Sequence, residues 1–375
     1  MLKVRAAKKI FFNRVERILI RATNWIGDAV MNLPAIAAVR KTFPGAKISV
    51  LVRPWVAELF RICTDVDEVL LLQSSGIHSG IPGKLRIAME LKPKRFDMAI
   101  LLQNAIEAAI ITYLAGIPIR AGYNSDGRGG LLTHSVKRTK AIRGVHQIDY
   151  YLEMVKSLGC QSAGREIHLR LGKDYDLLSE RLLHEYGLGD NHPLIGVAPG
   201  ATYGPAKRWF PERFAAVADR LVDDFSAVVI LFGSPADRES TDAVADRARH
   251  SLINLAGKTD LKEAIALISR LDLFITNDSG LMHVASALGI PTIAIFGSTN
   301  PITTSPAGAN SVVIYRGVPC SPCLKKRCPT DFRCMELIGI DEVYEAARIA
   351  MNKQQVIAHS SQLIANTIAV NKGKV

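Results

Sequence analysis

The sequence predicts an α/β protein built from two Rossmann-like, doubly wound domains in tandem. Short and almost wholly apolar runs alternate with segments in which apolar residues recur at helical spacing. Strands that are apolar on both faces are typical of a parallel sheet covered by helices on each side. This alternation stops in a polar stretch over 171–191 and restarts after Pro193, which indicates a domain boundary. No run of about 18 apolar residues occurs, so no membrane-spanning helix is expected.

The first domain is expected to cover residues 1–175. Its first helix is predicted over Asp28–Phe43, where Val30, Leu33 and Ala37 recur at helical spacing. The strands predicted in this domain are Arg17–Thr23, Lys47–Val52, Val66–Leu72 and Phe96–Gln103.

The second domain is expected over 190–345, followed by a C-terminal helix and tail over 346–375. Because ligands of doubly wound domains bind at the carboxyl ends of the strands, site residues are expected in the loops that follow them. The predicted strands are Leu194–Ala198, Ala227–Phe232, Ile253–Ala256, Leu271–Thr276 and Thr292–Phe296. The predicted helices are Pro211–Val222, Asp237–His250, Asp260–Arg270 and Ser279–Leu288.

The net charge of +12 over 375 residues is unevenly distributed. Residues 1–175 carry 27 Lys and Arg against 14 Asp and Glu, whereas the remaining residues carry 20 against 21. A basic first half indicates an anionic partner there, such as a phosphorylated ligand, a membrane surface or nucleic acid, unless it is only a solvated surface. Aromatic residues make up only 6% and no nucleic-acid module is recognisable, which argues against nucleic acid. The basic N-terminus lacks a secretory signal pattern, so a cytoplasmic protein is expected.

The first candidate site follows the first predicted strand and contains Asn24, Trp25, Gly27 and Asp28. A glycine at this turn lets the backbone pass close to a ligand. Asp28 is either the N-cap of the helix or a general base at the ligand-binding edge of the sheet.

The second candidate site, over 199–209, follows the first strand of the second domain and contains Thr202 and Lys207. It is neither a Walker loop nor a G-x-G-x-x-G turn. Its two glycines and its mobile cation nevertheless suit phosphate, although a Gly/Pro-rich surface connector has the same composition.

The third candidate site is the strand-to-helix junction that contains Asp278, Ser279, Gly280, Leu281 and His283. Asp278 or Ser279 is expected to cap the helix, whose first amides attract anions. His283 is either a buried structural side chain or a site residue. A similar turn at 233–235 precedes a further candidate, Asp237.

Four cysteines form a C-x2-C-x4-C-x5-C array whose basic neighbours would favour thiolates. Three interpretations remain open: a structural zinc site, disulfide or redox pairing, and unlinked thiols. The array lies outside the three strand-end loops in sequence, so a structural role is expected. Its members are Cys320, Cys323, Cys328 and Cys334.

The strings at 24–32, 199–209, 231–234 and 276–285 together resemble glycosyltransferase family 9. The resemblance covers roughly residues 16–350. It implies a GT-B fold, in which two Rossmann-like domains face each other across a cleft, with the acceptor on the first and the nucleotide sugar on the second. It also implies an inverting transfer of L-glycero-D-manno-heptose from ADP-heptose to the first heptose of the Kdo–lipid A inner core, at the cytosolic face of the anionic inner membrane.

The resemblance also implies roles for single residues. Asp28 matches the catalytic base, with Asn24, Trp25 and Gly27 on the acceptor side. Lys207 matches the residue that neutralises the donor diphosphate.

The remaining implied contacts are all to the donor. The amides of Ser279, Gly280 and Leu281 would share the diphosphate charge, so that catalysis requires no metal cofactor. Asp278 would hold heptose hydroxyls, and His283 would lie beside the phosphates. The other donor ligands implied are Thr202, for phosphate or sugar, and Asp237, for ribose.

Two other classes of function remain open. One is a related GT-B enzyme, such as a heptosyltransferase of type I or III or another surface-polysaccharide transferase, since these share the phosphate-binding chemistry. The other is a non-enzymatic protein that binds anionic lipid or nucleic acid through the basic half.

Overall fold

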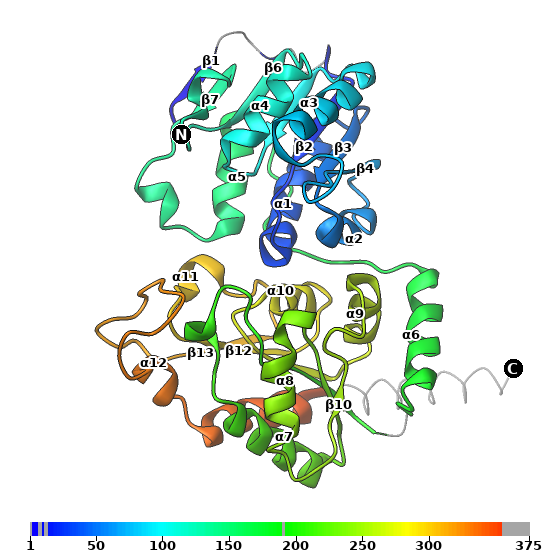
Figure 1. The fold of residues 1–375 in the computed structure, drawn as a ribbon, viewed down its shortest axis with the longest axis vertical. Helices are drawn as coiled ribbons and strands as arrows, with labels where there is room; N and C mark the ends of the chain where they lie inside the picture. Colours follow the sequence, from blue (N-terminus) through cyan, green and yellow to red (C-terminus); the bar gives the residue numbers. More distant parts are fainter. Residues whose placement is uncertain (1, 7–9, 11–13, 190–191, 355–375) are drawn as a thin grey trace, which may run out of the picture. The chain divides into compact units, whose positions relative to one another are not determined.

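The computed structural model describes residues 2–6, 10, 14–189 and 192–354. The chain divides into two compact units, each with its own sheet (Figure 1). The first unit comprises Met1–Gly172 with Ile302–Ala307, and the second comprises Lys173–Pro301 with Gly308–Val375. The polar stretch predicted as a boundary is therefore partly structured: Lys173–Glu185 is a helix, α6, that packs on α9 (Leu261–Ile268) of the second unit.

The first unit contains a seven-stranded sheet in the order β1-β7-β6-β5-β2-β3-β4. Every pairing is parallel except that of β1 with β7, which is antiparallel. The four predicted strands are present, and three further strands, β1, β6 and β7, extend the sheet on one side. The strands are β1 (Val4–Ala6), β2 (Arg17–Arg21), β3 (Lys47–Val52), β4 (Glu68–Leu71), β5 (Met98–Leu101), β6 (Ile119–Tyr123) and β7 (His134–Val136).

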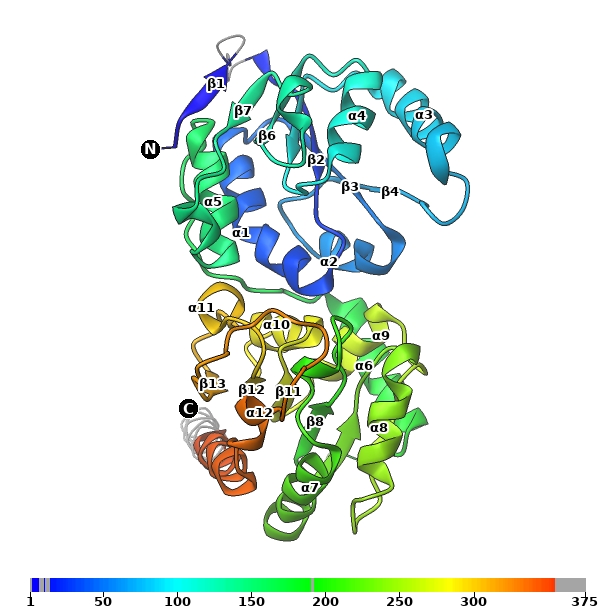
Figure 2. The same ribbon diagram turned by 60° about the vertical axis from the view of Figure 1, so that its left-hand side comes forward.

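Helices cover both faces of this sheet, as its apolar strands require. Alternate strand residues such as Leu19 and Leu51 pack with Ile87 of α3 and Ala108 of α4, whereas α1 and α5 pack together on the opposite face (Figure 2). The helices are α1 (Ile26–Thr42), α2 (Ala57–Arg61), α3 (Gly80–Leu91), α4 (Ile106–Leu114) and α5 (Gln147–Ser157).

The second unit contains a six-stranded sheet, wholly parallel, in the order β10-β9-β8-β11-β12-β13. The five predicted strands are present, and β13 adds an edge strand. The strands are β8 (Leu194–Ala198), β9 (Val228–Leu231), β10 (Ile253–Asn254), β11 (Leu273–Asn277), β12 (Thr292–Phe296) and β13 (Ser311–Tyr315).

The core of the second unit lies between this sheet and helices on each side. Trp209 and Phe214 pack on one face of the sheet together with Val343 and Met351, which lie in the helical segment 340–354. The first residues of the predicted C-terminal segment are thus part of this core, whereas 355–375 lie outside the described residues. The remaining helices are α7 (Pro211–Phe225), α8 (Arg238–Ala245), α10 (Gly280–Ala287), α11 (Pro301–Thr304) and α12 (Arg333–Glu336).

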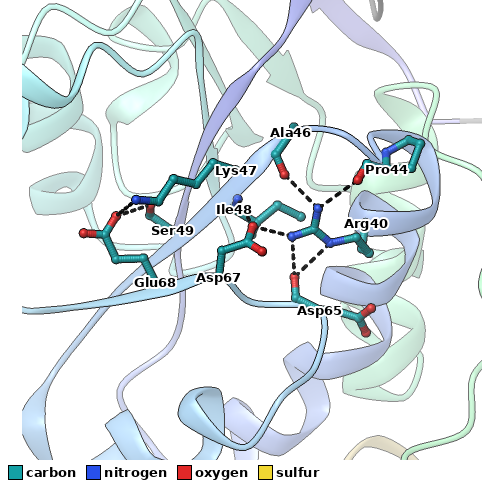
Figure 3. A network of polar contacts seen from close by, with 9 residues as sticks. All are labelled: Arg40, Pro44, Ala46, Lys47, Ile48, Ser49, Asp65, Asp67 and Glu68. Atoms are coloured by element: carbon teal, nitrogen blue, oxygen red, sulfur yellow. Dashed lines mark hydrogen bonds and ion pairs between the residues drawn. The ribbon is translucent and has the colours of Figure 1, made fainter.

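Part of the positive charge of the first unit is neutralised at the β3–β4 edge (Figure 3). Arg40 donates to Asp67 Oδ2 at 2.5 Å and to the carbonyl of Ala46 at 2.7 Å. Glu68 Oε1 accepts from Lys94 Nζ at 2.6 Å, and its Oε2 accepts from Ser49 Oγ at 2.9 Å. Burial opposes ionisation of Glu68, but these hydrogen bonds outweigh it and lower its pKa to about 2.

Candidate active site

Asp28 lies at the carboxyl edge of the first sheet, as the third residue of α1. The N-cap position belongs to Trp25, which has extended backbone and makes no side-chain capping bond. The N-cap interpretation of Asp28 is therefore wrong, since the helix begins two residues earlier than predicted. The carboxylate is half-buried in the first helical turn, where the helix dipole favours a negative charge. Burial, and next the negative charge of Asp28, raise the pKa of the Tyr151 hydroxyl.

Buried polar side chains hold the turn that leads to Asp28. Asn32 Oδ1 accepts from both the amide and the hydroxyl of Thr23, at 3.1 and 3.0 Å. Arg21 Nη2 donates to Asn24 Oδ1 at 3.0 Å, and Trp55 Nε1 donates to the Asn24 carbonyl at 2.8 Å. Asn24 thus has a structural part in the turn in addition to any contact with ligand. The sequence did not single out Arg21, Asn32 or Trp55 as positioning residues.

The other two acceptor-side candidates differ in exposure. Trp25 is 60% exposed, whereas Gly27 is buried beneath the turn. Of these two residues, Trp25 is therefore the one whose side chain a ligand could reach.

The second unit brings two of the predicted loops together. Lys207 Nζ lies 2.6 Å from Asp278 Oδ2, and the two side chains are only 14% and 6% exposed. Thr299, which sequence reasoning did not identify, donates its hydroxyl to the same Asp278 oxygen at 2.7 Å. These residues follow β8, β11 and β12, which are neighbours in the sheet. A cation and a carboxylate therefore share the carboxyl edge of the second sheet.

Asn277 fastens these loops to each other. Its Nδ2 donates to the carbonyl of Pro199 at 2.7 Å, and its Oδ1 accepts from the amide of Trp209 at 3.0 Å. Both ends of the 199–209 loop are thus held by one fully buried side chain. No sequence signal distinguishes this role from that of any other asparagine in a loop.

The start of α10 lies beside this pair. Ser279 occupies the N-cap position without a side-chain capping bond, and its hydroxyl lies 3.0 Å from that of Thr276. The predicted capping side chain is therefore not used as a cap. Gly280 and Leu281 are the first two helical residues, and amides at this position have no partner within the helix. His283 is buried, with 5% of its surface exposed.

The remaining two donor candidates have different surroundings. Thr202 is exposed on its loop. Asp237 is 7% exposed, and its Oδ2 accepts from the amide and the hydroxyl of Ser234 at 3.0 and 2.6 Å. A Cβ added at Gly200 would lie 2.3 Å from Asp237 Oδ1, so only glycine lets the 199–209 loop pass this close to the Asp237 carboxylate. The carboxylate of Asp237 thus holds its own turn and lies close to the backbone of the 199–209 loop.

The cysteine-bearing segment, residues 320–334, packs against the 199–209 loop although the two are far apart in the sequence. Tyr203 donates its hydroxyl to the carbonyl of Leu324 at 2.7 Å, and the amide of Ala206 donates to the carbonyl of Lys326 at 3.0 Å. A Cβ at Gly204 would lie 2.4 Å from that same carbonyl oxygen. Tyr203 and Leu324 are 121 residues apart in the sequence, so spacing along the chain does not predict their contact.

The four thiols themselves are free, and none forms a disulfide. Within residues 2–6, 10, 14–189 and 192–354, no group of three or more His, Cys, Asp or Glu side chains is arranged to hold a metal ion. Burial, and next the neighbouring cysteines, raise the pKa of the Cys334 thiol. The structure thus links none of these thiols by a disulfide, and zinc binding by them stays a prediction.

Comparisons with known proteins agree with this fold. The model of the family described as glycosyltransferase family 9 (heptosyltransferase) matches residues 84–332. Lipopolysaccharide heptosyltransferase 2 of Salmonella typhimurium is 31% identical over 306 residues, or 80% of this chain and 87% of that protein. The Escherichia coli protein of the same name is 30% identical over equal coverage.

Solved structures extend the likeness to the whole fold. The structure of Escherichia coli ADP-heptose lps heptosyltransferase II has a TM-score of 0.76 at 26% identity, and the match covers 90% of this chain and 99% of that one. A family 9 structure from Veillonella parvula has a TM-score of 0.81 at 24% identity, covering 92% and 99%. The predicted GT-B class, with two Rossmann-like domains, is confirmed. The chain is a glycosyltransferase, and it belongs to glycosyltransferase family 9.

Proposed function

We propose that this enzyme transfers L-glycero-D-manno-heptose from ADP-heptose to the first heptose of the lipopolysaccharide inner core, with inversion at the anomeric carbon. The relatives named heptosyltransferase 2 support the sugar and the acceptor class. The observation that carries the proposal is the buried Lys207–Asp278 pair beside the start of α10, since it combines a cation for a diphosphate with a carboxylate for a sugar.

Donor binding relies on charges and dipoles supplied by the second unit. Lys207 contacts the diphosphate of ADP-heptose, and the amides of Ser279, Gly280 and Leu281 bind its oxygens at the helix N-terminus. As the diphosphate takes the Lys207 ammonium, Asp278 is released toward the heptose hydroxyls. Thr202, Asp237 and His283 are the further donor contacts proposed. Because these groups neutralise the leaving ADP, no divalent metal is needed for catalysis.

Asp28 acts as the general base on the first unit. The acceptor hydroxyl oxygen forms a bond to the anomeric carbon while its proton passes to the Asp28 carboxylate, and the bond from that carbon to the ADP oxygen breaks. A single carboxylate in line with the acceptor suffices for inversion, because no covalent intermediate is formed. Trp25 supplies an exposed aromatic surface for the acceptor sugar.

The location proposed is the cytosolic face of the inner membrane, with peripheral contact through the basic first unit. Among the described residues, no helix combines the length and the apolar character that crossing a membrane requires. An acceptor built on Kdo–lipid A is anionic, and the first-half excess of positive charge suits it. Nucleic acid is not proposed as a partner.

The decisive experiment is incubation of the enzyme with ADP-heptose and core acceptors that carry none, one or two heptoses, followed by mass spectrometry. A single heptose added only to the acceptor with one heptose supports the proposal. Addition to the acceptor with none would assign a type I enzyme, and addition to the acceptor with two would assign type III. No transfer to any of them would refute heptose transfer to the core.

A further inference from the structure

A pocket of about 570 Å³ lies in the first unit, where β1 pairs with β7 and the loop after β6 passes beside them. Its volume is in the range of small-molecule sites. Three cations, Lys3, Arg5 and Lys137, line it together with the glycine-rich loop 127–130. None of the residues that form the catalytic and donor-binding sites lines this pocket.

The strand register places the three cations on one face of the sheet. Arg5 lies opposite Ser135, and the amide of Lys137 donates to the carbonyl of Lys3 at 2.9 Å, so Lys3 and Lys137 are cross-strand neighbours. Side chains on opposite residues and on alternate residues of one strand share a face. Like charges in this arrangement repel each other.

No carboxylate of the protein relieves this repulsion in the part of the chain that the structure describes. Aspartate and glutamate are absent from the pocket lining, and no ion pair there involves Lys3, Arg5 or Lys137. This contrasts with the cations of the β3–β4 edge, where Asp67 and Glu68 supply counter-charges. The pocket therefore concentrates positive charge that an anionic ligand would neutralise.

The glycine-rich loop leaves its backbone open to such a ligand and is held in position from below. A Cβ added at Gly127 or Gly130 would meet no atom within 4 Å, whereas one at Gly129 would lie 2.5 Å from Asn124 Oδ1. The fully buried Arg128 anchors the loop, because its Nε donates to the carbonyl of Tyr123 at 2.9 Å and its Nη1 to that of Gln103. The pocket wall is thus preformed.

We propose that this pocket binds the phosphate group of an anionic lipid headgroup and so holds the lipid-linked acceptor on the first unit. This inference rests on the proposed function and adds a binding site to it. The pocket opens at the carboxyl ends of β6 and β7, the same edge of the sheet from which Asp28 begins α1. The cations of the pocket lie on β1 and beside β7, four and three strand spacings from β2, which is roughly 14–19 Å along the sheet. Strand β1 lies outside residues 84–332, the part that the family model matches.

Gly130 offers a direct test, because its backbone lies outside the left-handed region and its Cβ position is open. Gly130→Asp places a carboxylate in the pocket, and Gly130→Asn places a neutral side chain of the same size there. The full-length protein is floated with phosphatidylcholine vesicles that contain or lack phosphatidic acid, with and without inorganic phosphate as competitor. ADP binding, a property of the second unit, is measured on each variant.

We expect phosphatidic acid to be required for flotation, Gly130→Asp to weaken it about tenfold or more, and Gly130→Asn to stay within about twofold of wild type. Lys3→Gln combined with Lys137→Gln should weaken it as Gly130→Asp does, and ADP affinity should not change in any variant. Equal flotation of the Asp and Asn variants would overturn the proposal. Absence of wild-type flotation with vesicles that contain phosphatidic acid would overturn the lipid assignment. Failure of the wild type to bind ADP would instead refute the proposed function and leave the vesicle result standing.

Discussion

Replacement of Lys207 by methionine is the sharpest test of the donor site. Methionine keeps an unbranched stem of similar length over Tyr203, whose ring centre lies 5.2 Å from Lys207 Nζ, but removes the charge. The matched control is Lys262→Met on the same unit. Lys262 Nζ lies 5.2 Å from the ring centre of Tyr175 and 3.3 Å from Asp174, but its side chain is 41% exposed and that of Asp174 64%.

Two effects of different size are expected from Lys207→Met. A hydrogen bond to a charged group contributes about 1.5–3 kcal/mol, so the dissociation constant for ADP should rise roughly 10- to 140-fold. Removal of the cation also leaves the Asp278 carboxylate buried with Thr299 as its remaining partner. Breaking a buried pair in this way costs about 3 kcal/mol, the lower end of the usual range, because 14% of the Lys207 side chain is exposed. The exposed control pair should cost about 0–1 kcal/mol and leave ADP binding unchanged.

Titration calorimetry with ADP and urea unfolding measure the two effects separately. The double variant Lys207→Met with Asp278→Asn removes the unpaired charge, so it should recover most of the stability but none of the affinity. That combination distinguishes a lost ligand contact from a damaged fold. An ADP dissociation constant for Lys207→Met within twofold of wild type would place the diphosphate site elsewhere and refute the proposed donor site.

Three further outcomes are expected. Asp28→Ala should keep its affinity for ADP, but its rate of heptose transfer should fall about 10²- to 10⁴-fold, which is the contribution of a general base. Transfer at the wild-type rate in the mass-spectrometric assay would show that Asp28 is not the base. Because the pKa of Glu68 is lowered in the folded protein, its carboxylate contributes at most about 3 kcal/mol of stability, which is complete above pH 4.5 and is lost as the pH falls toward 2. The free energy of unfolding of Glu68→Gln should therefore change less with pH across that window than that of wild type. Metal analysis of freshly purified protein tests the structural zinc interpretation: about one equivalent of zinc that is lost in Cys320→Ser would support it, and less than about 0.1 equivalent would contradict it.

The strands of both sheet centres could be predicted because they are buried on both faces and so are apolar throughout. Strands β6 and β7 were missed, since Arg120 and His134 interrupt their apolar pattern. Strand β1 is a three-residue antiparallel edge with exposed residues, which carries no such pattern at all. Helix α6 was missed for a similar reason: its few buried side chains lie among many charged ones, and its packing on α9 supplies the stability that propensity does not.

The α/β alternation, the loops at the strand ends and the family resemblance could all be predicted from the sequence, because each depends on residues that are close together in the chain. Which of these loops meet depends on the fold. Strand order joins Lys207 to Asp278 and Thr299, and it brings Tyr203 to the cysteine-bearing segment. In the same way, β1 and β7 carry cations into one pocket although more than a hundred residues separate them. The physical reason is that a sheet places strands by hydrogen-bond pairing and burial, so contacts between strand ends depend on topology rather than on spacing in the sequence.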